Sequence, residues 1–242
     1  MRPNRFIAQL CLILTLVFVV ATSRTGHGQD SKSLYANMAP LEQYLMDRDA
    51  EIDLARSAAP DSISHDATVA VLGRHGYETA VQGKNGFVCV VERGWMDGFD
   101  DPEFWNPKQR GPICYNPEAA RSVLPITYLR TKLALAGSSK DEIRDGIKQA
   151  YARKELPLLE PGAMSFMMAK HAHITDKKLT ADGSHNIAHL MFYTPVINSA
   201  DWGANLDKSP VYLNPVFRDP EPVEVFVVLT GMWSDGTPAP LQ

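Results

Sequence analysis

The sequence predicts an α+β fold: a single domain with a mainly antiparallel sheet and amphipathic helices. Strand-like runs are grouped early in the chain, two helical segments follow, and further strand-like runs come after them. Grouped strands of this kind favour α+β, whereas a parallel α/β sheet needs strands and helices that alternate. The hydrophobic content of 45% and the charged content of 21% are those of an ordinary soluble domain.

Residues 1–28 have the pattern of an export signal. Two arginines precede an almost unbroken apolar run over residues 6–21, and small residues follow it. We expect cleavage before Gln29, a linker over residues 29–36 and the domain over residues 37–242. An uncleaved anchor is the alternative, because the apolar run is only slightly shorter than the roughly 20 residues that span a bilayer. The pattern predicts a periplasmic or extracellular protein.

The expected mature chain is acidic. Cleavage before Gln29 removes three arginines and no acidic residue, which changes the net charge from −4 to −7. Nucleic acids and anionic membrane surfaces both require a cationic face on the protein. We therefore expect no nucleic-acid partner and no membrane insertion after cleavage. A small molecule or an envelope protein is the expected partner.

Cys89 and Cys114 are the two cysteines of the expected mature chain, since Cys11 lies in the apolar run. An oxidising compartment favours their pairing, so the sequence predicts a disulfide. Two buried thiols, or a nucleophilic cysteine without a local histidine, are the alternatives. A cross-link at this separation would stabilise the fold by roughly 3.5 kcal/mol.

The first half of the domain is expected to contain one helix and three strands. Apolar residues at helical spacing predict an amphipathic helix over residues 40–59, which would keep Glu51 in water. Glycine-rich turns separate the strand-like runs that follow, and glycine supplies the positive φ that tight hairpins need. We therefore expect an antiparallel meander over residues 68–72, 77–81 and 87–91.

The middle of the chain is expected to be irregular and then helical. Prolines and glycines interrupt residues 95–112. An asparagine cap followed by a proline then predicts a helix over residues 116–137, with a kink at Pro125. A serine followed three residues later by a glutamate has the pattern of a capping box and predicts a second helix over residues 140–154.

Three strand-like runs complete the expected sheet. They cover residues 164–169, 188–194 and 223–229. The last run is apolar nearly throughout, which predicts a central strand that is covered on both faces.

Five segments of the chain resemble a family of exported bacterial proteins of unassigned function. The resemblance would cover most of the mature chain. It implies an export signal and a shared fold, and it brings no activity, cofactor or catalytic residue. The segments are Asn85–Cys89, Gly111–Cys114, His189–Tyr193, Trp202–Asn205 and Trp233–Gly236.

A histidine-rich stretch is the best candidate for chemistry. His171, His173, His185 and His189 lie close together in the sequence, after a methionine-rich strand. Imidazoles alone would suit zinc, and imidazoles beside a thioether would suit copper. Their spacing matches no specific zinc or copper framework, so core packing and a polar loop form the competing interpretation.

His189 is the histidine most expected to face a cleft. It begins an apolar run that ends at Tyr193, which places it at the mouth of a strand. We expect a cleft lined by His189, Tyr193 and Trp233. A hydrogen-bonded structural histidine is the competing interpretation.

An acidic stretch offers a further candidate. Its carboxylates would suit calcium, but their spacing is not that of an EF-hand loop. The aromatic residues beside it would form either a sugar-stacking shelf or a small hydrophobic cluster beneath a long loop. The acidic residues are Asp97, Asp100, Asp101 and Glu103.

The sequence contains none of the strong catalytic patterns. The nucleophile elbow, the helical zinc-protease motif, the phosphate loop and the dinucleotide fingerprint are all missing. We therefore expect an exported binding or envelope-associated protein without catalysis and without a cofactor. The alternative is a metal-binding protein or metal-dependent enzyme that uses His171, His173 and His189 with zinc or copper.

Overall fold

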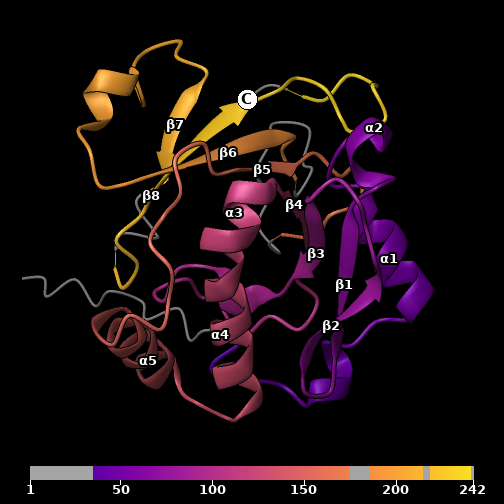
Figure 1. Cartoon of the computed structure of the whole chain (residues 1–242), viewed down its shortest axis with the longest axis vertical. Helices are drawn as coiled ribbons and strands as arrows, with labels where there is room; N and C mark the ends of the chain where they lie inside the picture. Colours follow the sequence, from indigo (N-terminus) through magenta and orange to yellow (C-terminus); the bar gives the residue numbers. More distant parts are fainter. Residues whose placement is uncertain (1–34, 175–185, 215–218, 241–242) are drawn as a thin grey trace, which may run out of the picture. The chain divides into compact units, whose positions relative to one another are not determined.

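The computed structural model describes residues 35–174, 186–214 and 219–240. These residues form one sheet in the order β2-β1-β3-β4-β5-β6-β8-β7, with helices packed against it (Figure 1). Every strand pair is antiparallel except β1 with β3, which confirms the α+β fold and its mainly antiparallel sheet. The strands are β1 Thr68–Gly73, β2 Gly76–Val81, β3 Val88–Glu92, β4 Gly111–Tyr115, β5 Met164–Met167, β6 His189–Thr194, β7 Val211–Asn214 and β8 Glu224–Leu229.

The helices follow the expected order with different bounds at the N-terminal end. The first predicted helix starts at Arg48 rather than Pro40, because the Asp47 side chain accepts hydrogen bonds from the amides of Asp49 and Ala50 and so caps it there. The α-helices are α1 Arg48–Arg56, α2 Asp61–Ser64, α3 Pro117–Ser122, α4 Leu124–Leu135 and α5 Lys140–Ala152, and the 3₁₀ helices are Leu41–Gln43, Gly94–Met96 and Ser199–Trp202.

The expected meander over the first three strands is wrong. β1 and β2 form the predicted hairpin, but β3 pairs with the other edge of β1 and runs parallel to it. Cys89, Val90 and Val91 of β3 are fully buried, and both faces of this strand therefore need cover. β2 is an edge strand and is half-buried or exposed along its length. A meander would place β3 on the outer side of β2, where β3 would be exposed to water.

Two strands were not expected from the sequence. β4 lies between β3 and β5 at the centre of the sheet and is buried along its whole length, although Pro112 interrupts its pattern. β7 is a short edge strand that pairs with β8. β8 is therefore next to an edge, and its C-terminal half is only half-buried, which corrects the expectation of full cover on both faces.

The helical middle of the chain matches its sequence pattern. Asn116 caps α3, and the break between α3 and α4 falls at Val123, just before Pro125. The capping box of Ser139 and Glu142 is present at the start of α5. These local hydrogen bonds form between residues close in sequence, which is why the pattern predicts them.

Different helices pack against the two faces of the sheet. On one face, Cys89 and Cys114 form the predicted disulfide and pack with Ala55 of α1. On the other face, alternate residues such as Ile113 pack with Val123 and the start of α4. α1 contacts β1, β3 and β4, whereas α3 contacts β4 and β5 (Figure 1).

The long segment between β3 and β4 contributes to the core. Its aromatic residues are buried and pack with Ile126, Ile143 and Ile147 of the helices, so they form a hydrophobic cluster rather than a sugar-stacking shelf. They are Trp95, Phe99, Phe104 and Trp105. Among the helices of the described ranges, none has the length and apolar character that a membrane span requires.

Candidate functional site

A cavity of about 260 Å³ lies against the sheet face that carries Ile113. Its floor comes from consecutive strands: Met167 is opposite His189, and His189 is opposite Leu229, so these side chains share one face. Residues of the segment between β3 and β4 form the facing wall. The lining residues are Glu92, Arg93, Met96, Asp97, Gln109, Gly111, Met167, Ile174, Ile187, His189, Met191, Val227 and Leu229.

Most of this lining is apolar, with three methionines among it. Methionine side chains are flexible and polarisable, and they adapt to apolar ligands of different shapes. Gly111 is opposite Glu92 in the strand register and adds no side chain, which leaves room beside the Glu92 carboxyl group. Val227 and Leu229 are half-buried because they face this space.

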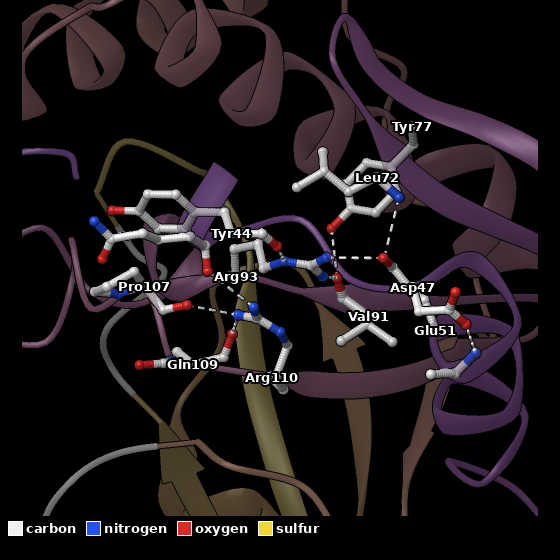
Figure 2. Close-up of polar contacts among 12 residues, drawn as sticks. Tyr44, Asp47, Glu51, Leu72, Tyr77, Val91, Arg93, Pro107, Gln109 and Arg110 are labelled. Carbon is white, nitrogen blue, oxygen red and sulfur yellow. Dashed lines mark hydrogen bonds and ion pairs between the residues drawn. The ribbon is translucent and has the colours of Figure 1, made fainter. Parts of the chain in front are cut away.

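Arg93 closes one end of the cavity, and all of its nitrogens are engaged (Figure 2). Its Nη2 lies 3.0 Å from both carboxylate oxygens of Glu51, Nε donates to the Tyr44 carbonyl at 2.8 Å, and Nη1 donates to the Val91 carbonyl. Arg93 and Glu51 are each 1% exposed. The prediction that Glu51 stays in water is therefore wrong, because the guanidinium replaces the water that its charge would lose on burial.

Asp97 and Gln109 form a hydrogen-bonded pair in the wall of the cavity. Gln109 Nε2 donates to Asp97 Oδ2 at 2.5 Å, and the Asp97 backbone carbonyl accepts from Arg130 at 3.0 Å. Burial raises the pKa of Asp97 to about 8, and the nearby charges of Asp101 and Glu92 contribute to the rise. Asp97 is thus a carboxyl group that is largely protonated at neutral pH.

The other end of the Gln109 amide is unsatisfied. Gln109 is 3% exposed, and its Oε1 is buried without a hydrogen-bond partner among the residues that the structure describes. Arg110 donates to the backbone carbonyls of Pro107 and Gln109, and so holds the backbone that carries this side chain (Figure 2). A buried acceptor of this kind costs about 1–3 kcal/mol unless a ligand or water supplies a donor.

Glu92 lies between the cavity and a smaller hollow of about 30 Å³. Its Oε1 accepts hydrogen bonds from the Tyr115 hydroxyl at 2.5 Å and from the Thr127 hydroxyl at 3.0 Å. Burial raises the pKa of Glu92, and these two hydrogen bonds oppose the rise without cancelling it. The hollow is large enough for a water molecule, with Tyr193 and Glu221 among its polar lining.

His189 presents a neutral imidazole. Its Nδ1 lies 2.6 Å from the Ile187 carbonyl, which requires the proton on Nδ1 and leaves Nε2 as an acceptor. Burial lowers the pKa of His189, and the bond to Ile187 offsets this only in part. Within the described part of the chain, Nε2 has no hydrogen-bond partner.

The structure separates the three residues of the expected cleft. His189 lines the cavity, and Tyr193 lines the adjoining hollow, where its hydroxyl lies 2.9 Å from the Ser165 hydroxyl. Trp233 lines neither space: it is buried in a turn where its amide donates to the Thr237 carbonyl. The cavity and the hollow share Glu92 and two methionines in their linings.

The histidines of the histidine-rich stretch lie in different parts of the structure. His171 is exposed, the backbone of His173 pairs with that of Arg110, and His189 lines the cavity. His185 lies outside the described residues. In the described part of the chain, no three His, Cys, Asp or Glu side chains lie together as metal ligands.

The acidic residues considered for calcium also diverge. Asp100 is exposed and lies 3.5 Å from Arg144, and Asp101 Oδ1 accepts from the Glu103 amide at 2.8 Å. Glu103 Oε2 accepts from Asn106, whereas Asp97 faces the cavity. The acidic stretch therefore stabilises its own loop through these contacts, and one of its residues, Asp97, belongs to the candidate site.

Neither Glu92 nor Gln109 was predicted from the sequence as a site residue. The sequence does contain a signal for Glu92, which is a glutamate at the end of an apolar strand. A charged residue directly after three buried positions must be paired, protonated or at a cavity. Gln109 has no comparable signal in its neighbourhood. Its position depends on β4, which the sequence pattern did not predict.

Searches of protein-family models, of curated proteins and of solved structures found no match to this chain. The resemblance to a family of exported bacterial proteins stays a prediction.

Proposed function

We propose that this protein is an exported binding protein, which holds a small and mostly apolar molecule in the cavity without changing it chemically. The observation that carries this proposal is the cavity of about 260 Å³, with an apolar wall and five polar side chains, Glu92, Arg93, Asp97, Gln109 and His189. Small-molecule sites typically combine an apolar lining with a few convergent polar groups.

The volume limits the size of the ligand. An engineered apolar cavity of about 150 Å³ accepts benzene, and drug-sized ligands occupy about 300–1,000 Å³. A molecule with one ring or a short chain therefore fits the space. The polar groups would orient such a ligand, because each of them has a defined hydrogen-bonding state.

Binding of benzyl alcohol by calorimetry tests this proposal. The wild-type protein should bind it, and Val227→Phe should abolish binding because the larger side chain fills the cavity. Val228→Phe is the matched control: Val228 follows on the same strand, and its side chain belongs to the other face of the sheet. Equal binding by the two variants, or no binding of benzyl alcohol, benzylamine or benzoate by the wild-type protein, would contradict the proposal.

Export is part of the proposal and has its own test. The apolar run at residues 6–21 and the disulfide between Cys89 and Cys114 both support an oxidising compartment. We expect the mature chain to begin at Gln29 in the periplasmic or extracellular fraction. The intact mass of protein exported by its own signal measures this, and a full-length mass in the membrane fraction would contradict cleavage.

A further inference from the structure

Apart from the protonated Asp97 carboxyl group, the protein itself uses the side-chain donors of the described cavity lining. The three guanidinium nitrogens of Arg93 bind Tyr44, Val91 and Glu51. Gln109 Nε2 donates to Asp97, and His189 Nδ1 binds the Ile187 carbonyl. A carboxylate ligand therefore finds no free donor on Arg93, Gln109 or His189, and the donor that the protonated Asp97 carries is lost when Asp97 ionises.

Several acceptor atoms, in contrast, are not used by the protein. Gln109 Oε1 is buried without a partner among the described residues, and His189 Nε2 has none there either. Asp97 binds Gln109 through Oδ2, and Glu92 binds Tyr115 and Thr127 through Oε1. The second oxygen of each carboxyl group accepts no hydrogen bond from the described part of the chain. The cavity thus offers an imidazole nitrogen and, once Asp97 and Glu92 are ionised, two carboxylate oxygens as acceptors.

The charges around the cavity favour the same type of ligand. The nearest arginines are already paired, Arg93 with Glu51 at 3.0 Å and Arg130 with Glu221 at 2.6 Å. Among the described residues, neither Asp97 nor Glu92 forms an ion pair. When these carboxyl groups ionise, neither has an ion-pair partner among the described residues, and desolvated carboxylates without such a partner are unfavourable.

We propose that the ligand of this cavity is a small amine, a molecule with an apolar body and one protonated amino group. This inference rests on the proposed binding function and names the ligand class. An ammonium group has three donors and no acceptor, which suits the acceptors that His189 Nε2 and the ionised carboxyl groups of Asp97 and Glu92 provide. Its charge would pair with Asp97 and Glu92, while the apolar body would contact the methionines and Leu229.

The same chemistry makes the affinity depend on pH. Asp97 is largely protonated in the free protein at neutral pH, and a bound ammonium group would favour its ionised form. Binding should therefore release up to one proton per ligand, and affinity should rise at least tenfold from pH 6 to pH 8. The charged or titratable groups around Asp97 are Glu92 on β3, Arg93 and Asp101 on the following segment, Arg130 on α4, Lys140 on α5 and His189 on β6.

Three probes of similar size separate the ligand classes: benzylamine, benzyl alcohol and benzoate. At pH 8, calorimetry of the wild-type protein should show that benzylamine binds at least tenfold more tightly than benzyl alcohol and that benzoate does not bind. Titrations of benzylamine near pH 7 in two buffers with different heats of ionisation should report the released proton. This last measurement needs no variant.

Asp97→Asn tests the residue that is expected to select the amine. It keeps the size of the side chain and an oxygen for Gln109 Nε2, so it should still bind benzyl alcohol while losing most of the preference for benzylamine. Glu92→Gln is the second variant and should reduce the preference in the same direction. Binding of benzyl alcohol or benzoate as tight as that of benzylamine would overturn the amine inference and leave the binding proposal standing. Failure of all three probes would overturn both.

Discussion

Replacing Asp97 with asparagine also tests how the cavity affects folding. Burial raises the pKa of Asp97 from 3.8 to about 8. Between these two values the native protein holds a proton that the unfolded chain releases, so the free energy of unfolding falls as the pH rises through this window. Below pH 3.8 both states are protonated and the effect vanishes. The asparagine side chain does not titrate, so the Asp97→Asn variant should lack this decline.

The size of this change in stability follows from the pKa shift of Asp97. One pKa unit corresponds to about 1.36 kcal/mol, so the full shift would lower the stability of the wild-type protein by ~3.5 kcal/mol between pH 5 and pH 8. Asp97 is only half-buried, because part of its surface faces the cavity. Water there would reduce the effect, and we expect a relative gain of ~2 kcal/mol for Asp97→Asn over this range.

The assay is denaturant unfolding of both proteins at pH 5, 6, 7 and 8. Glu92 also has a raised pKa through burial, but it is present in both proteins and largely cancels in their difference. The exposed Asp207→Asn is the control for the general effect of replacing an aspartate with an amide. A difference between the wild-type protein and Asp97→Asn that stays constant from pH 5 to pH 8 would refute the buried, protonated carboxyl group.

Three further predictions concern the fold. Replacing both Cys89 and Cys114 with serine should lower the free energy of unfolding by about 3.5 kcal/mol, and reductant should bring the wild-type protein to the same value. Glu51→Leu should cost about 3–5 kcal/mol because it leaves Arg93 buried without its partner, whereas the double variant Glu51→Leu/Arg93→Leu should cost clearly less than the sum of the two single changes in denaturant unfolding. Ser139→Ala should lower stability by about 1 kcal/mol by removing the cap of α5, and an unchanged unfolding midpoint would contradict that role.

Several elements could be predicted from residues close in the chain. The caps at Asn116 and Ser139, the hairpin of β1 and β2 and the apolar runs of β6 and β8 all depend on contacts or patterns within a few residues. The disulfide followed from the number of cysteines and the expected compartment, without any knowledge of the strand register. Local hydrogen bonds and periodicity determine such features, and they are visible in the sequence.

The tertiary structure alone decided where the strands pair and what the cavity contains. Placing β3 beside β1 and β4 buries both of its faces, and no local pattern distinguishes that position from a place beyond β2. The same arrangement brings Glu92, Gln109 and His189 to one space from positions far apart in the chain. Sequence patterns predict single faces of single elements, whereas burial, raised carboxyl pKa values and unpaired acceptors arise only when several elements exclude water together.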